Sequence, residues 1–106
     1  MSASKSPMAK YWFGKRAPEH ADGWFTFYRA VKSQGVLDAK TKELIAAAVG
    51  LVMRCEHCVE AHGKDAIRAG ASKEELAEAL MVASQIASAS QLFYMSESLD
   101  KLMADE

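Results

Sequence analysis

An apolar run of ten residues, 44–53, constrains the fold of this chain more than any other feature. The run is too short for a transmembrane helix, which needs about 20 apolar residues. It follows Asp38, a residue type that often caps a helix N-terminus, so the sequence predicts a helix from Ala39 to about Met53. A helix that is apolar on all sides is normally buried. Other segments of the chain must therefore cover it.

Start and stop signals predict two further helices on either side of this run. Pro18 suits the start of a helix over residues 19–32, and Gly35 would follow its end. After the apolar run, a third helix carries the only two cysteines of the chain and ends at Gly70. These signals place the cysteines at the beginning of a helix.

A capping box predicts a fourth helix. Ser72 and Glu75 have the spacing in which each side chain bonds the backbone N–H of the other residue. The stretch 76–90 is rich in Ala and Ser, which permits close helix–helix approach. Beyond it, large apolar residues recur at spacings of three and four, as in a coiled coil: Leu92, Met95, Leu99 and Leu102. Because no alternating β-branched run occurs, we expect an all-α protein, a compact helical bundle.

The length of the chain favours oligomerisation. Its 106 residues predict a single domain, 1–106, with a mobile polar tail at residues 1–10. A chain this short buries little surface per residue, and seven of its nine aromatic residues cluster within residues 11–28. Leaving all of this apolar surface exposed would create a patch typical of an interface. We therefore expect a homo-oligomer.

The net charge and the N-terminal sequence indicate which binding partners and which cellular location to expect. The net charge of −1 provides no strong basic field, so we expect no binding to nucleic acid and none to an anionic membrane. Residues 1–10 lack the apolar segment of a signal peptide, which predicts a cytoplasmic location. In that compartment a lone C-x-x-C motif is more often redox-active or metal-binding than a structural crosslink.

An eight-residue segment holds both cysteines and two of the three histidines: Cys55, His57, Cys58 and His62. A helix advances about 100° per residue, so Cys55, Cys58 and His62 fall on one face. A helix N-terminus lowers the pKa of a thiol, and the neighbouring Arg54 acts in the same direction. The arrangement is typical of a dithiol redox centre with a proton acceptor one turn away.

A zinc site is the alternative interpretation. Cys55, Cys58 and His62 could supply three ligands, with His57 or Glu43 as a fourth. One helix face offers three ligands awkwardly, however, and no second Cys/His pair follows. A non-enzymatic zinc-binding module or an oligomeric scaffold module thus remains the second hypothesis.

Glu43 has an ordinary and a functional interpretation. As an acid in the first turn of a helix it interacts favourably with the helix dipole and needs no further role. As a buried carboxylate it could instead accept or relay a proton from the thiols. In one straight helix, Glu43 and Cys55 would lie roughly 18 Å apart. A relay therefore requires the chain to reverse near residues 50–54.

The spacing of Glu43 from the C-x-H-C-x-x-x-H segment resembles the signature of the alkylhydroperoxidase D branch of the carboxymuconolactone decarboxylase family. The flanking stretches 37–45 and 69–75 match as well, and the similarity extends over residues 24–102. The resemblance implies an all-helical fold, assembly into an oligomer, most simply a hexamer, and thiol-dependent reduction of hydroperoxides or disulfides. Lactone decarboxylases of the wider family lack the C-x-x-C motif, so decarboxylation is not expected.

The same resemblance implies a role for each matching position. Cys58 would be the thiolate that attacks the peroxide or a partner, and Cys55 its disulfide partner. Glu43 and His62 would form the proton relay, and His57 would assist. The reaction needs no cofactor and no metal, only a hydroperoxide and an external dithiol reductant of the lipoyl, thioredoxin-like or another class.

Overall fold

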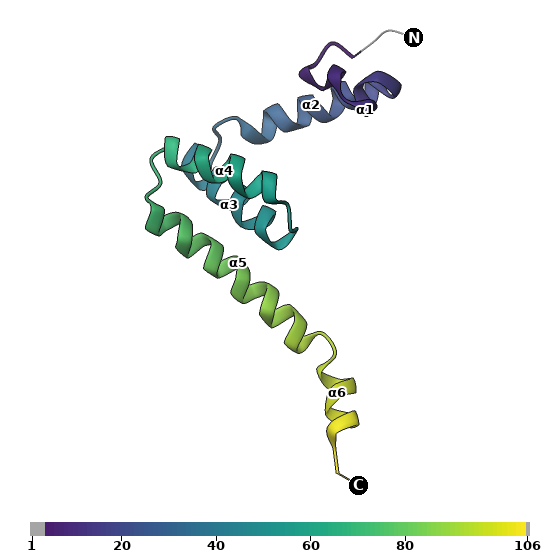
Figure 1. The fold of residues 1–106 in the computed structure, drawn as a ribbon, viewed down its shortest axis with the longest axis vertical. Helices are drawn as coiled ribbons and strands as arrows, with labels where there is room; N and C mark the ends of the chain where they lie inside the picture. Colours follow the sequence, from purple (N-terminus) through teal and green to yellow (C-terminus); the bar gives the residue numbers. More distant parts are fainter. Residues whose placement is uncertain (1–3, 106) are drawn as a thin grey trace. The chain divides into compact units, whose positions relative to one another are not determined.

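Helices form all the regular secondary structure in residues 4–105, the part of the chain that this computed structural model describes (Figure 1). This confirms the all-α prediction. The chain divides into two compact units, Met1–Leu37 and Asp38–Glu106. The expectation of one domain over residues 1–106 stays a prediction. Within the described residues, no helix is long and apolar enough to cross a membrane.

The first unit contains a short 3-10 helix, η1 (Pro7–Lys10), and the helices α1 (Trp12–Arg16) and α2 (Pro18–Lys32). Residues 4–10, part of the expected mobile tail, form hydrogen bonds within the first unit, and their mobility stays a prediction. Ser4 is buried and donates a hydrogen bond to the Asp22 carboxylate of α2, and Ser6 caps η1. Residues 1–3 of the expected tail lie outside the described residues. The polar composition of the segment thus reflects capping and side-chain hydrogen bonds.

The second unit is built on the antiparallel pair α3 (Ala39–Val52) and α4 (Glu56–Arg68), with α5 (Lys73–Phe93) packed against α3. The predicted caps are confirmed. The Asp38 carboxylate accepts a hydrogen bond of 2.8 Å from Thr41 N–H, and Ser72 and Glu75 form the reciprocal capping box.

An ion pair ties the first turns of α3 and α5 together. Lys40 Nζ lies 3.0 Å from Glu75 Oε2. The backbone N–H of Ser72, followed by the Lys40 ammonium group, holds the pKa of the Glu75 carboxyl below its usual value. The same glutamate therefore caps its own helix and positions α3 relative to α5.

The apolar helix α3 is not buried on all sides, contrary to the expectation. Its buried residues are Glu43, Ala47 and Gly50. Several large apolar side chains remain exposed: Ile45, Val49, Leu51, Val52 and Met53. The reason is geometric, because α4 and α5 cover only part of the circumference of α3. The second unit thus leaves apolar surface uncovered.

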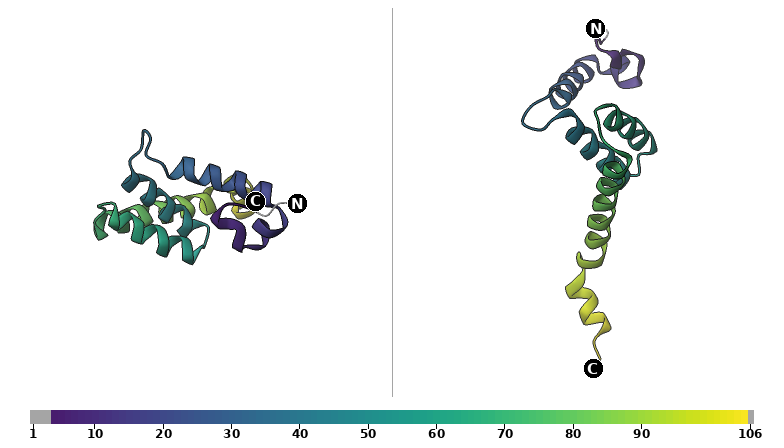
Figure 2. Two further views of the ribbon diagram at one scale, coloured as in Figure 1. Left: turned by 90° about the horizontal axis from the view of Figure 1, so that it is seen from above. Right: turned by 90° about the vertical axis from the view of Figure 1, so that its left-hand side faces the viewer.

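The apolar stripe beyond residue 90 does not lie on one continuous helix. The helix breaks at Tyr94 and Met95, and a separate helix, α6 (Ser96–Met103), follows. Leu92 therefore lies on α5, while Leu99 and Leu102 lie on α6. The spacing of three and four correctly indicated helical structure. The residues that share this spacing nevertheless belong to two separate helices, because the helix breaks between Phe93 and Ser96 (Figure 2).

Candidate functional site

The chain reversal required for a proton relay lies between α3 and α4. Cys55 N–H donates to Gly50 O at 2.8 Å, and Arg54 N–H donates to Leu51 O at 3.1 Å. This pair of bonds is the Schellman motif that ends many helices. Its left-handed position is occupied by Arg54, with φ of 56°, where glycine is usual. An arginine there costs roughly 1–2 kcal/mol. The surrounding contacts therefore hold a strained turn directly before the first cysteine.

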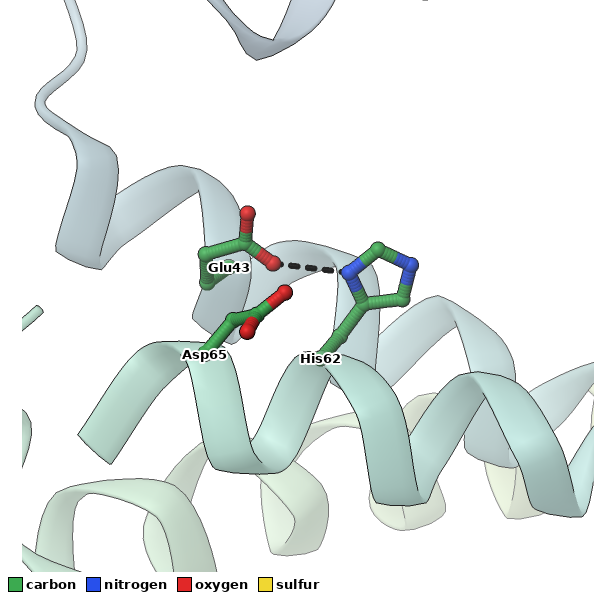
Figure 3. A group of neighbouring side chains, drawn as sticks. All are labelled: Glu43, His62 and Asp65. Carbon is green, nitrogen blue, oxygen red and sulfur yellow. Dashed lines mark hydrogen bonds and ion pairs between the residues drawn. The ribbon is translucent and has the colours of Figure 1, made fainter. Parts of the chain in front are cut away.

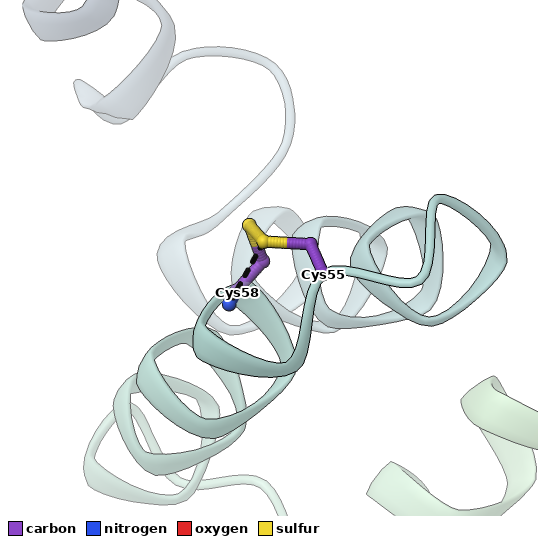
Figure 4. The surroundings of a disulfide bond; sticks show 2 residues. All are labelled: Cys55 and Cys58. Carbon is purple, nitrogen blue, oxygen red and sulfur yellow. Dashed lines mark hydrogen bonds between the residues drawn. A yellow bond between two sulfur atoms is a disulfide. The ribbon is translucent and has the colours of Figure 1, made fainter.

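Cys55 and Cys58 form a disulfide at the N-terminus of α4 (Figure 4). Their Cα atoms are 5.2 Å apart. Cys55 is also the N-cap of α4, because its Sγ accepts a hydrogen bond of 3.2 Å from Cys58 N–H. Cys55 is thus both the last residue of the Schellman motif that ends α3 and the N-cap of α4. The hydrogen bond and the helix dipole favour negative charge on Cys55 Sγ once the bond is reduced.

Gly50 lets α3 approach the disulfide closely. A Cβ atom at residue 50 would lie 2.8 Å from Cys58 Cβ and 3.3 Å from Val59 N. Both neighbours are backbone or next to it, so they cannot rotate away. Gly50 therefore determines how closely Cys58 packs against α3, a constraint that sequence reasoning missed.

We predict that Gly50→Ala destabilises the protein. Alanine gains about 1 kcal/mol of helix propensity over glycine, but overpacking against Cys58 costs about 1–3 kcal/mol. The expected net loss is about 1 kcal/mol in the free energy of unfolding, measured with urea. Gly63→Ala in α4 is the matched control, because its Cβ would meet only Leu76 Cδ2 at an ordinary 3.5 Å. The prediction is wrong if the Gly50 variant is as stable as the Gly63 variant.

Glu43 and His62 form a hydrogen-bonded pair between α3 and α4 (Figure 3). Glu43 Oε2 lies 2.7 Å from His62 Nδ1, and the Glu43 side chain is only 10% exposed. A carboxylate can only accept, so Nδ1 carries the proton, which leaves Nε2 of the neutral ring as a proton acceptor. His62 also follows Cys58 by four residues, the spacing of neighbours on a helix face. The reversal near residues 50–54 is thereby confirmed.

Asp65 lies beside the Glu43–His62 pair as a third titratable side chain. It was not singled out from the sequence. One potential ligand atom from each of Glu43, His62 and Asp65 lies within 4.8 Å of the others. The signal was available, because Asp65 follows His62 by three residues on the same helix. This group differs from the expected zinc ligands, since it contains neither cysteine. In the structure Cys55 and Cys58 are instead bonded to each other.

His57 remains outside both pairs. Its side chain is exposed on the first turn of α4. No hydrogen bond or ion pair within residues 4–105 joins it to Glu43, His62 or the cysteines. The structure therefore groups four of the five expected residues into two adjacent pairs, and the assisting role of His57 stays a prediction.

Comparison with known families gives a match over most of the chain. The sequence profile of the carboxymuconolactone decarboxylase family matches residues 18–98. A crystal structure of a protein from Methanobacterium thermoautotrophicum has the same fold, with a TM-score of 0.73 and 35% sequence identity. The similarity covers 80% of this chain and 92% of that one. It therefore includes most of the helical fold of both proteins.

Three bacterial relatives share parts of the sequence, and each is described as uncharacterized. A Paracoccus denitrificans protein, "uncharacterized protein 4 in cox locus", is 42% identical over 61% of this chain. A Haemophilus influenzae protein is 43% identical over 50%, and one from Cupriavidus necator is 31% identical over 81%. The matched regions span 59%, 47% and 76% of these relatives, respectively.

Proposed function

The chain belongs to the carboxymuconolactone decarboxylase family, and from this premise we propose that it is a thiol-dependent oxidoreductase that reduces hydroperoxides or disulfides. One observation carries the proposal. The Cys55–Cys58 disulfide begins the same helix that presents His62 to the buried carboxylate of Glu43. A dithiol that cycles between reduced and oxidised forms needs both a second thiol and a nearby group that takes up protons.

The proposed peroxide reaction begins at Cys58. Its thiolate attacks the terminal oxygen of the hydroperoxide, the O–O bond breaks, and the alkoxide takes up a proton from the site and leaves as the alcohol. The Cys55 thiolate attacks the sulfur of the resulting Cys58 sulfenic acid and forms the disulfide, and the hydroxide that leaves takes up the proton that Cys55 had given up and departs as water. The order follows the family resemblance; in the structure Cys58 N–H donates to Cys55 Sγ, a contact that favours the thiolate of Cys55 needed for the second step once the disulfide is reduced. An external dithiol then reduces the disulfide by exchange.

Protons move through His62 in this proposal. The Nε2 atom takes the proton of the attacking thiol and later returns it to the leaving alkoxide. The Glu43 carboxylate, 2.7 Å from Nδ1, stabilises the imidazolium that forms in between. His57, exposed on the first turn of α4, is assigned an assisting role near the solvent. In this proposal the Cys55–Cys58 and Glu43–His62 pairs carry out the reaction without a metal or a cofactor.

A cycling dithiol also requires a suitable compartment and partner. Because such a dithiol must be reduced after every turnover, we place the protein in the reducing cytoplasm. The reductant is a dithiol of the lipoyl, thioredoxin-like or another class. The exposed apolar residues of α3, α5 and α6 support assembly into a homo-oligomer, for which a hexamer is our proposal.

Peroxide consumption with different reductants tests the function. We expect catalytic turnover of an organic hydroperoxide with dihydrolipoamide or thioredoxin, and little with glutathione, because a monothiol must react twice to release a disulfide. Equal amounts of protein are assayed after full reduction, and zinc is measured in the same preparation. Absence of turnover with all three reductants, together with stoichiometric zinc bound to the reduced thiols, would instead favour the zinc-binding module.

A further inference from the structure

Three side chains of α3 and α4 bring together donor atoms of the kind that bind metal ions. One ring nitrogen of His62 and one carboxylate oxygen from each of Glu43 and Asp65 lie within 4.8 Å of one another. His62 and Asp65 are three residues apart on α4, so they share a face, and Glu43 meets them from α3. Figure 3 shows the Asp65 carboxylate turned toward the hydrogen bond between the other two side chains. The three donors thus surround one small space.

The donor atoms need only small movements to surround a metal ion. Zinc binds nitrogen and carboxylate oxygen at about 2.0–2.2 Å, so two donors of a tetrahedral zinc ion lie about 3.4 Å apart. Glu43 Oε2 and His62 Nδ1 are 2.7 Å apart with a proton between them. Exchange of this proton for zinc would open that distance to about 3.4 Å and would bring the Asp65 oxygen, at most 4.8 Å away, to the same distance. Rotation of the side chains is sufficient for both changes.

The cluster is held firmly on one side and is open to solvent on the other. The Glu43 side chain is only 10% exposed and is fixed between the two helices. The side chains of His62 and Asp65 are 28% and 30% exposed, respectively. An ion can therefore enter past His62 and Asp65, and water can complete its coordination.

The charges of the cluster favour a cation. Two carboxylates this close together in a partly buried space repel each other. Arg68 Nη1 lies 3.2 Å from Asp65 Oδ1, but the Arg68 side chain is 76% exposed, so water and salt screen its charge. A divalent cation between the helices would offset the repulsion directly, because it would contact both carboxylates.

We propose that Glu43, His62 and Asp65 bind a Zn²⁺ ion, with His62 Nδ1 as the nitrogen ligand. An imidazole nitrogen together with two carboxylate oxygens suits zinc and similar transition metals, whereas Mg²⁺ and Ca²⁺ take oxygen ligands. Neither cysteine belongs to this group, so the site is available while Cys55 and Cys58 are bonded to each other. It therefore differs from a zinc site built on the reduced thiols.

Zinc at this position reverses the proton arrangement of the His62 ring. A neutral imidazole carries its proton on one nitrogen and a lone pair on the other, and the hydrogen bond to Glu43 places the proton on Nδ1. A metal on Nδ1 needs the lone pair there. The Nδ1 proton therefore passes to water, which supplies another to Nε2, and the ring stays neutral. Nε2 then donates and can no longer accept the thiol proton, so zinc blocks the relay; this consequence rests on the proposed function.

Equilibrium dialysis of the oxidised, untagged protein against Zn²⁺ tests the site. The intact disulfide removes both cysteines as ligands, and without a reductant the protein does not turn over, so the result is independent of the proposed function. We expect one zinc ion per chain and no competition from Mg²⁺. Asp65→Asn and Glu43→Gln should each weaken binding about tenfold or more, since even groups that only support a ligand contribute that much. Glu60→Gln, on the exposed surface of α4, is the matched control and should bind zinc as the unsubstituted protein does.

NMR of the ring nitrogens of His62 in the same oxidised protein identifies the atom that binds. We expect the ring proton on Nδ1 without zinc and on Nε2 with zinc. A ring that keeps its Nδ1 proton and binds zinc through Nε2 would overturn the site.

The dialysis gives two further outcomes that would overturn the proposal. One is zinc binding that survives both Asp65→Asn and Glu43→Gln while circular dichroism shows folded protein, because the exposed His57 or His20 would then hold the ion. The other is the absence of zinc binding at submillimolar concentration. Equal competition by Mg²⁺ would show that the carboxylates bind without the imidazole and would exclude His62 Nδ1 as a ligand.

Discussion

Cys58→Ser is expected to reduce peroxide turnover to the uncatalysed background. A serine hydroxyl is not ionised at neutral pH and cannot form the sulfenic acid that the second thiol attacks. Cys55→Ser should behave differently, because it leaves the attacking thiol in place. That variant should consume one equivalent of peroxide and then stop, with Cys58 held as a sulfenic acid or a mixed disulfide.

Single-turnover assays with a sulfenic-acid trap and mass spectrometry measure this difference. The trap should label Cys58 in the Cys55→Ser protein and label nothing in Cys58→Ser. Equal peroxide-dependent turnover in the unsubstituted protein and in Cys58→Ser would falsify the assignment. A label on Cys55 in the Cys58→Ser protein would show instead that the N-capping thiol is the one that meets the peroxide.

Glu43→Gln should lower peroxide turnover by about two orders of magnitude without unfolding the protein, since positioned acid–base groups typically contribute that much. Glutamine keeps the size of the side chain and an oxygen that accepts from His62 Nδ1, but it lacks the negative charge. The imidazolium at His62 is then less stable, so Nε2 becomes a weaker proton acceptor. Thiol alkylation should therefore require a higher pH than in the unsubstituted protein.

The pH dependence of alkylation distinguishes this relay from a simple charge effect. A negative charge near a thiol disfavours the thiolate, so removing it directly would let alkylation begin at lower pH. We expect the opposite shift, because Glu43 contacts His62 and no hydrogen bond joins it to a cysteine among the described residues. Glu60→Gln, on the exposed surface of α4, is the matched control. An unchanged curve for Glu43→Gln would leave Glu43 with a helix-dipole role alone.

The local signals of the sequence were sufficient for the four longest helices, but not for η1, α1 or the break before α6. Asp38 and Ser72 cap α3 and α5 as predicted, because a cap depends on residues within one turn. The pairing of Glu43 with His62 was implied by the family resemblance alone, and the structure shows the two side chains in contact. The turn itself did not follow, since Arg54 occupies a left-handed position that glycine usually marks.

By itself, the sequence determined the helical class, the helix caps and the placement of Cys58 and His62 on one helix that begins directly after Cys55. These features depend on interactions within a few residues along the chain. Only the tertiary structure decided that Gly50 packs against Cys58, that Asp65 lies near Glu43, and that α3 and α6 keep exposed apolar faces. Each of these depends on which surfaces of two helices meet, and helical periodicity describes the faces of a helix without specifying its neighbour.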